Sequence, residues 1–301
     1  MDDLDFSGKP AAPAAKLAVK PSPPSEPASL YEPRLALEFF KIAGTLEQFA
    51  AGKQIFAENE KTGGLFSKGA RIYLLLDGDV TLTLKGKPVE LVLPGEVFGE
   101  MAAIAETPRA ATATARKACR VLSIDEKAFL QSLQQMPEFA LMLMSVMAQR
   151  LRRSIAKFAE TGKAAGAAPV QKNSLDKKML AELQRELGNP LPTVAQAGQN
   201  VVTKGAVGAC MFVVTKGRIA ISVDGVVIEH VEPGGVFGEM ALVERASRAA
   251  TATAETESAW LLIARNDFLA MVKAKPIFGI ALLRSMAGRV QHVGKLLHEI
   301  G

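Results

Sequence analysis

The sequence predicts a mainly β protein with flanking helices, built as two tandem β-jelly-roll domains that are each followed by a long C-terminal helix. Three observations indicate this fold class. The length of 301 residues fits about two domains. Residues over nearly eighty positions recur at a constant offset of 139, as with Gly99 and Gly238. Each copy of this repeat consists of short apolar or alternating runs that end at glycine turns.

The chain divides into four segments by composition and by the repeat. Residues 1–33 are rich in proline, alanine, serine and lysine, a composition that cannot bury enough apolar surface to offset chain entropy. We therefore expect a disordered tail there. Residues 34–160 and 174–301 hold the two copies of the repeat. Residues 161–173, between them, contain glycines and a proline and are typical of a flexible linker.

The strands are expected in the same order in both copies. The runs YLLLDG, DVTLTLKG and PVELVLPG occur in the first copy, and MFVVTKG, RIAISVDG and VVIEHVEPG occur in the second. One further run, CRVLSI or AWLLIA, comes later in each copy. Many short strands at such spacing indicate a sandwich or barrel, and the jelly roll is the form we expect.

Helical patterning begins at Asp125 and at Asn266 and ends in two long helices, at about residues 138–159 and 277–300. Each long helix carries an apolar row at the three-four spacing of a packed seam. We expect the two helices to pack against each other within one chain, which makes the protein a monomer with an internal pseudo-dimer. The alternative is a homodimer in which these helices pair between chains.

The most similar part of the repeat lies between the predicted strands. FGEMAAIAETPRAATATA begins at Phe98 and FGEMALVERASRAATATA at Phe237, and they agree at 12 of 18 positions. A glycine in a tight turn lets the backbone approach a bound group closely, and the amides of a following helical turn favour an anion. An arginine supplies a planar fork suited to two phosphate oxygens, and a carboxylate accepts a hydrogen bond from a ribose hydroxyl. Phosphate and sugar together indicate a nucleotide.

This motif resembles the phosphate-binding cassette of the cyclic nucleotide-binding domain, which occurs in kinase regulatory subunits, gated channels and the bacterial catabolite activator protein. The family's pattern is FGE, then Leu or Met, then Ala-Leu, a short variable helix and Pro-Arg-Ala-Ala-Thr. The two copies depart from it at Ala103, which replaces the leucine, and at Ser247, which replaces the proline. The resemblance covers about residues 34–160 and 174–301.

The resemblance implies a role for each matching residue. It assigns Glu100 and Glu239 to the ribose 2′-hydroxyl and Arg109 and Arg248 to the cyclic phosphate. Backbone amides near four alanines would complete the cradle, namely Ala102, Ala110, Ala241 and Ala249. In the family, a threonine or serine directly after the arginine is associated with cyclic GMP, so alanine at this position favours cyclic AMP over cyclic GMP.

In the bacterial regulator, later residues of the long helix cover the base of the ligand. Aligned from Arg150 and Arg289, these lid positions fall near Ser154 and Ile155 in the first copy and near Val293 and Gly294 in the second. Only the first has a hydroxyl there, so we expect the two sites to differ in affinity or selectivity. The first candidate site is Phe98, Gly99, Glu100, Met101, Ala102, Arg109, Ala110, Ala111 and Ser154; the second is Phe237, Gly238, Glu239, Met240, Ala241, Arg248, Ala249, Ala250 and Val293.

Catalysis finds little support in the sequence. His230, His292 and His298 are dispersed and are expected at the surface or facing a partner, so they do not form an acid-base pair or a metal cluster. Cys119 and Cys210 lack the paired spacing of a metal site or disulfide and favour a reducing compartment. We therefore expect no enzyme activity, no metal and no cofactor other than the nucleotide ligand.

Nucleic-acid and membrane functions are also disfavoured. The net charge of +5 is a weak excess, and the basic residues between 150 and 157 are interpreted as a solvated helix face. One short helix, expected within residues 175–188, is fewer than the two that a helix-turn-helix requires, so direct DNA binding is not expected. No apolar run approaches the roughly 20 residues of a membrane span, and the acidic start does not resemble a secretory signal. We expect a cytoplasmic protein that has no membrane segment.

These observations predict a non-enzymatic sensor that binds cyclic AMP, or cyclic GMP, at two cassettes and signals through a protein partner or self-association. Two alternatives remain open, because a protein can keep a fold after its binding site has changed or been lost. One is a receptor for a cyclic dinucleotide. The other is a ligand-free jelly-roll scaffold with degenerate sites, in which the glutamate and arginine of each motif form a structural ion pair.

Overall fold

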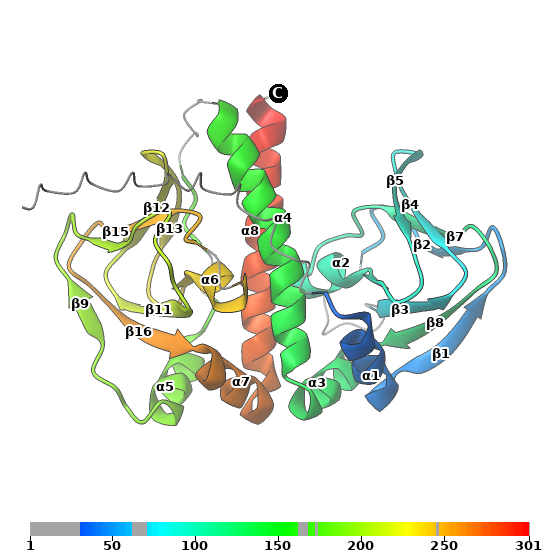
Figure 1. Cartoon of the computed structure of the whole chain (residues 1–301), viewed down its shortest axis with the longest axis horizontal. Coiled ribbons are helices and arrows are strands. Elements are labelled where there is room, and N and C mark those ends of the chain that lie inside the picture. The colour runs from blue at the N-terminus through cyan, green and yellow to red at the C-terminus, as the bar shows by residue number, and fades with distance from the viewer. Residues whose placement is uncertain (1–30, 62–70, 162–167, 172–173, 245–246, 301) are drawn as a thin grey trace, which may run out of the picture.

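The computed structural model describes residues 31–61, 71–161, 168–171, 174–244 and 247–300, with the side chains of residues 294–300 left undescribed. Residues 1–30 of the predicted disordered tail lie outside these ranges. Figure 1 shows two β domains with a pair of long helices between them.

The two domains repeat one order of helices and strands. The first contains α1 (Pro33–Ala43), β1 (Thr45–Phe49), β2 (Gln54–Phe56), β3 (Ile72–Asp77), β4 (Val80–Leu84), β5 (Lys87–Val92), β6 (Val97–Phe98), α2 (Glu100–Ala105), β7 (Thr112–Ala115), β8 (Cys119–Ile124), α3 (Glu126–Gln135) and α4 (Glu138–Thr161). The second contains α5 (Lys177–Glu186), β9 (Thr193–Ala195), β10 (Asn200–Val202), β11 (Cys210–Lys216), β12 (Ile219–Val223), β13 (Val226–Val231), β14 (Val236–Phe237), α6 (Glu239–Glu244), β15 (Thr251–Ala254), β16 (Ser258–Ala264), α7 (Arg265–Ala274) and α8 (Pro276–Ile300).

Within the described residues, each domain is a sandwich of two four-stranded antiparallel sheets with the same strand order. The sheets are β1-β8-β3-β6 and β2-β7-β4-β5 in the first domain, and β9-β16-β11-β14 and β10-β15-β12-β13 in the second. Equivalent residues also pair in the same register, since Tyr73 lies opposite Phe98 and Phe212 opposite Phe237. The predicted fold class, two tandem jelly rolls each followed by a long helix, is confirmed.

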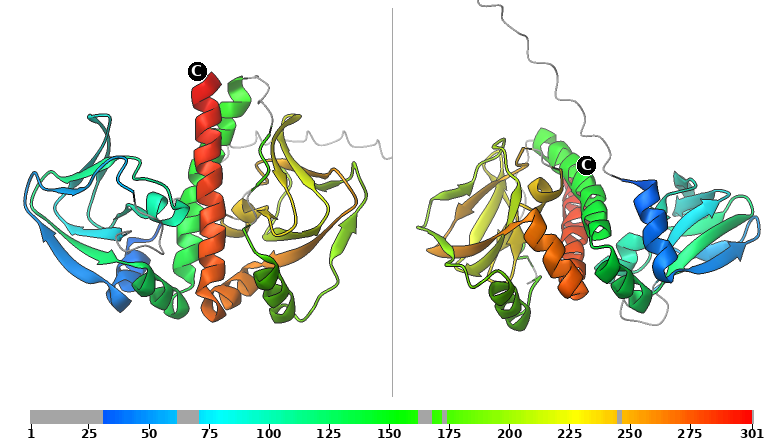
Figure 2. Two further views of the ribbon diagram at one scale, coloured as in Figure 1. Left: turned by 180° about the vertical axis from the view of Figure 1, so that it is seen from behind. Right: turned by 60° about the horizontal axis from the view of Figure 1, so that its bottom comes forward.

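The long helices α4 and α8 lie side by side in the middle of the molecule, as the views in Figures 1 and 2 agree. The apolar run at the start of α4 is buried between the two domains. A β-carbon at Gly279 in α8 would lie 3.7 Å from the β-carbon of Ala140 in α4. These two positions are 139 apart, so they are equivalent in the two copies of the repeat. The helices α4 and α8 therefore meet at equivalent residues, as identical helices do at the two-fold axis of a symmetric dimer.

Each long helix also contacts the opposite domain. Arg152 of α4 donates a hydrogen bond to the carbonyl of Ser247 (3.1 Å). Arg284 of α8 forms an ion pair with Glu106 (2.5 Å), directly after α2, and Gln291 of α8 donates to the hydroxyl of Thr107 (3.1 Å). Among the described residues, no helix is long and apolar enough to cross a membrane.

Part of the stretch predicted as a flexible linker is docked on the second domain. Thr161 is the last residue of α4, and residues 162–167 and 172–173 lie outside the described ranges. Gln171 donates its backbone N–H to the carbonyl of His230 (2.7 Å), and His230 donates to the carbonyl of Pro169 (2.9 Å). Composition alone predicted flexibility for residues 169–171, but the free edge of β13 supplies backbone partners that composition does not reveal.

Candidate functional site

Each candidate site begins at a glycine turn between a short strand and a short helix. Gly99 and Gly238 follow β6 and β14 with φ of 78° and 77°, a left-handed conformation that favours glycine. A β-carbon at Gly99 would lie 2.9 Å from Nη1 of Arg109, and one at Gly238 would lie 2.7 Å from Nη1 of Arg248. The missing side chain therefore makes room for the protein's own arginine, whereas the sequence suggested only a close approach to a ligand.

The two arginines are buried and are held by backbone carbonyls. Arg109 is 2% exposed and donates to the carbonyls of Gly99 (2.6 Å) and Arg71 (2.9 Å), and its guanidinium carbon lies 4.3 Å from the ring centre of Phe56. Burial lowers the pKa of Arg109 from its usual value. No described residue accepts a hydrogen bond from its Nε. The group is a buried cation stacked on an aromatic ring.

Arg248 repeats this arrangement in the second domain. It donates to the carbonyls of Gly238 (2.7 Å) and Cys210 (2.9 Å), and its guanidinium carbon lies 5.3 Å from the ring centre of Phe212. Within the part of the chain that the structure describes, no carboxylate forms an ion pair with Arg109 or Arg248. A buried charge without a counter-ion is costly, which favours an anionic ligand beside each guanidinium.

The motif glutamates pair with arginines of the long helices. Glu100 accepts from Arg150 of α4 at 3.4 Å, and Glu239 accepts from Arg289 of α8 at 2.6 Å. The ion pair inside each motif that the scaffold alternative assumed is therefore not formed. Burial raises the pKa of Glu100, and the charge of Arg150 acts in the opposite direction.

Arg150 and Arg289 were not predicted as site residues. The prediction that Arg150 lies on a solvated helix face is wrong, because its side chain reaches Glu100 and lines the first cavity. Of the same basic cluster, Arg153 and Lys157 are exposed as expected. The constant offset of 139 between Arg150 and Arg289 was the available signal, because a surface lysine or arginine has no reason to recur in register with a motif.

The structure gathers most of the predicted residues around two cavities. A cavity of about 480 Å³ in the first domain is lined by Phe98, Gly99, Glu100, Met101, Ala102, Arg109, Ala110 and Ala111. A cavity of about 80 Å³ in the second domain is lined by Phe237, Gly238, Glu239, Met240, Ala241, Arg248, Ala249, Ala250 and Val293. Nucleotide-sized ligands occupy pockets of roughly 300 to 1,000 Å³, so the first site has room and the second is closed.

Ser154 is the one predicted residue that does not line its cavity. The part of α4 that faces the first site lies earlier in the helix, at Leu143, Val146, Gln149 and Arg150. Beyond Arg150, α4 packs along the second domain instead, so Leu151 and Ile155 line the second cavity. The hydroxyl of Ser154 therefore does not distinguish the two sites in this structure. The sites differ instead in the volumes of their cavities.

The second site is closed by side chains from both long helices. Leu151 and Ile155 of α4 meet Arg289, His292 and Val293 of α8 in the lining of its cavity. The position of His292 differs from the surface location expected for the histidines. His230 lies in β13, where its Nδ1 is 3.0 Å from Glu255, and the side chain of His298 is outside the described residues.

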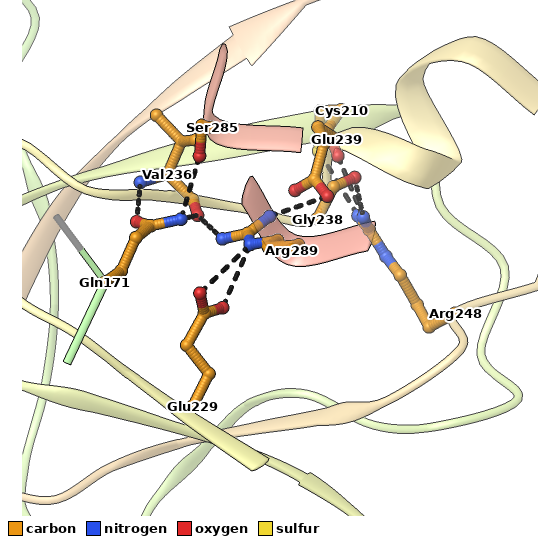
Figure 3. A network of polar contacts seen from close by, with 9 residues as sticks. All are labelled: Gln171, Cys210, Glu229, Val236, Gly238, Glu239, Arg248, Ser285 and Arg289. Atoms are coloured by element: carbon orange, nitrogen blue, oxygen red, sulfur yellow. Dashed lines mark hydrogen bonds and ion pairs between the residues drawn. The ribbon is translucent and has the colours of Figure 1, made fainter. Parts of the chain in front are cut away.

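Arg289 forms the centre of a buried charge network in the second site (Figure 3). Its Nη1 contacts Glu239 at 2.6 Å, its Nε contacts Glu229 of β13 at 2.9 Å, and its Nη2 donates to the carbonyl of Val236. Burial raises the pKa of Glu229. Burial alone would lower the pKa of Arg289, but the two neighbouring carboxylates raise it, and the net shift is upward. Oε2 of Glu239 has no partner among the described residues. One carboxylate oxygen thus remains available to a ligand hydroxyl.

Both domains match the sequence model of one protein family. The sequence model of the cyclic nucleotide-binding domain matches residues 46–136 and 192–275. The chain belongs to the cyclic nucleotide-binding domain family. The match includes both phosphate-binding cassettes, so each jelly roll is a cyclic nucleotide-binding domain.

Individual proteins of known function or structure match this chain at low sequence identity. The cAMP-dependent protein kinase regulatory subunit of Eremothecium gossypii is 28% identical over 205 residues, which cover 67% of this chain and 40% of that protein. The cGMP-dependent protein kinase of Toxoplasma gondii is 26% identical over 255 residues, which cover 83% of this chain and 22% of that protein. A solved structure of cAMP-bound PfPKA-R (141–441) is 22% identical with a TM-score of 0.33, covering 91% of this chain and 87% of that one. The chain spans less than half the length of these two curated relatives.

Proposed function

We propose that the chain is a non-enzymatic sensor of cyclic AMP with one binding site in each of its two domains. The observation that carries this proposal is the pair of buried arginines, Arg109 and Arg248, which are held by backbone carbonyls and have no carboxylate partner among the described residues. Such a guanidinium fits two oxygens of a cyclic phosphate. Residues 34–160 and 174–301 are the two proposed binding units.

Each part of the nucleotide is proposed to contact one set of groups in the site. Arg109 and Arg248 hold the phosphate, and the amides that follow them and that begin α2 and α6 complete the cradle. Glu100 and Glu239 accept a hydrogen bond from the ribose 2′-hydroxyl, for which Oε2 of Glu239 has a free position. The base lies against the long helices, near Val146 and Gln149 in the first site and near Val293 in the second.

The output is proposed to pass through a protein partner. The relatives named above include a kinase regulatory subunit, which supports a partner such as a kinase catalytic subunit. The contacts that α4 and α8 make with the opposite domain offer a route, because a ligand that moves Arg150 or Arg289 also moves a helix packed on the other site. A receptor for a cyclic dinucleotide and a ligand-free scaffold are the competing possibilities that the next experiment separates.

Calorimetric titration of the full chain with cyclic AMP, cyclic GMP and cyclic di-GMP tests the proposal. We expect cyclic AMP to bind at two sites of unequal affinity, the first domain binding more tightly, because its cavity of about 480 Å³ is open and the 80 Å³ cavity must enlarge. Two equal sites would contradict the expected difference. Binding of cyclic di-GMP alone, or of none of the three, would overturn the proposed function.

Selectivity for the base is tested by a threonine directly after each arginine. Ala110 and Ala249 line their cavities, and the family associates a hydroxyl here with cyclic GMP. We expect Ala110→Thr and Ala249→Thr each to raise the affinity for cyclic GMP relative to cyclic AMP by about tenfold, the effect of one well-placed hydrogen bond. Titration of each variant with both nucleotides measures the ratio. Ala110→Val is the matched control, because it has threonine's shape without the hydroxyl, and an equal shift in that variant would count against the proposed preference.

A further inference from the structure

Residues 169–171 lie between the two domains in sequence but are part of the second domain in space. Residue Val170 forms a parallel bridge with His230 at the edge of β13, and the backbone of Gln171 donates to the same strand. This segment comes from the end of α4, the helix that lines the first site. Its bridge to His230 lies directly beside Glu229 on the same strand.

The side chain of Gln171 continues inward from this edge and is 8% exposed. Its Oε1 accepts from the N–H of Val236 (2.9 Å), and its Nε2 donates to the carbonyl of Val236 (3.3 Å) and to the hydroxyl of Ser285 (3.0 Å). A β-carbon at Gly235 would lie 2.5 Å from Oε1, so the amide lies directly on the backbone. Every hydrogen-bonding group of this amide is used.

These bonds join the strand that leads into the cassette to the helix that closes it (Figure 3). Val236 belongs to β14, two residues before Gly238, and Ser285 belongs to α8, one turn before Arg289. The carbonyl of Val236 accepts from both Gln171 and Arg289. The amide of Gln171 thus fixes the distance between β14 and α8 at the point where Arg289 reaches Glu239.

We propose that Gln171 is a positioning residue of the second site: it clamps α8 on β14 and thereby holds Arg289 on Glu239 in the closed site. This inference rests on the proposed function, because it treats Glu239 as a ligand residue. A nucleotide must enlarge the cavity of about 80 Å³, and α8 lines that cavity with Arg289 and Val293. The apparent affinity of the site is reduced by the fraction of molecules that are closed, so a weaker clamp gives tighter binding.

The test compares Gln171→Met with Val170→Ala in the full chain. Methionine keeps the volume of the side chain and removes its three hydrogen bonds, whereas Val170 is half-exposed and contributes only backbone bonds. Cyclic AMP is titrated in an Arg109→Ala background, so that the second site is observed alone. We expect Gln171→Met to bind at least about three- to tenfold more tightly than the parent, since losing even one of its three hydrogen bonds would give that factor, and Val170→Ala to bind as the parent does. Ser285→Ala, which removes a single bond, is expected to shift affinity in the same direction by less.

Hydrogen exchange of the ligand-free protein supplies a second readout. The amide of Val236 and the middle of α8 are expected to exchange faster in Gln171→Met than in Val170→Ala. If Gln171→Met binds with unchanged or lower affinity while the parent binds cyclic AMP, the inference is overturned. If the parent binds no cyclic nucleotide, the proposed function fails instead. In that case the clamp is tested by hydrogen exchange alone, and equal exchange rates in Gln171→Met and the parent would reject it.

Discussion

Replacing Arg109 and Arg248 together is expected to abolish cyclic nucleotide binding. A hydrogen bond to a charged group contributes roughly 1.5 to 3 kcal/mol, so each single replacement by alanine weakens its own site by about tenfold to a hundredfold or more. The two arginines belong to separate domains and line different cavities, so Arg109→Ala should remove the first binding event in a titration and leave the second. Arg248→Ala should do the opposite.

The control for this experiment must account for the structural role of the same arginines. Arg109 donates to the carbonyls of Gly99 and Arg71, so alanine leaves buried acceptors unpaired and lowers the free energy of unfolding. Arg109→Lys keeps the charge and loses the fork, and is expected to lose phosphate affinity with less destabilisation. Arg120→Ala is the surface control, since Arg120 and its partner Asp77 are both exposed on the first domain. Unchanged cyclic AMP binding in a folded double variant would refute the phosphate role.

The repeat made most of the fold predictable, because the constant offset of 139 carried β3 to β8 onto β11 to β16. The glycine turn, the glutamate and the arginine of each cassette could also be placed, since a charged residue kept in step with a turn needs a partner. Which residues the two glutamates pair with could not be predicted. Glu100 and Glu239 form ion pairs with Arg150 and Arg289, which belong to helices about fifty residues later in the sequence. Sequence spacing does not show which face of a helix meets a site.

The packing of α4 on α8 within one chain was predicted and is found, but the contacts of each helix with the opposite domain could not be predicted, for the same reason. Leu151 and Ile155 have the apolar character of any packed helix, and only the crossing of α4 over the second domain places them in its cavity. Residues 169–171 have the composition of a linker, and their docking depends on the free edge of β13. Each of these features is decided by tertiary geometry, which overrides local composition.

The arrangement of α4 and α8 in one chain predicts that Ala140→Cys combined with Gly279→Cys forms an intramolecular disulfide. The β-carbons at these positions would lie 3.7 Å apart, within the roughly 3.5 to 4.5 Å that disulfides require. The bond would close a loop of well over a hundred residues, for which a stabilisation of about 2 to 4 kcal/mol is typical. Denaturant unfolding of the oxidised and reduced forms measures this difference. Replacing Cys210, which is partly exposed, by serine prevents competing bonds, while Cys119 is buried.

The single variant Ala140→Cys distinguishes an internal pseudo-dimer from a homodimer. If α4 packs on α8 of its own chain, the lone cysteine at 140 faces position 279, which has no thiol, and oxidation leaves a one-chain species on a non-reducing gel. If instead α4 of one chain packs on α4 of another, two-fold symmetry brings the two copies of residue 140 together, and a two-chain species forms. In the internal pseudo-dimer, the double variant should cross-link only within one chain at low protein concentration. A two-chain product from Ala140→Cys alone would show that the helix seam joins molecules rather than domains.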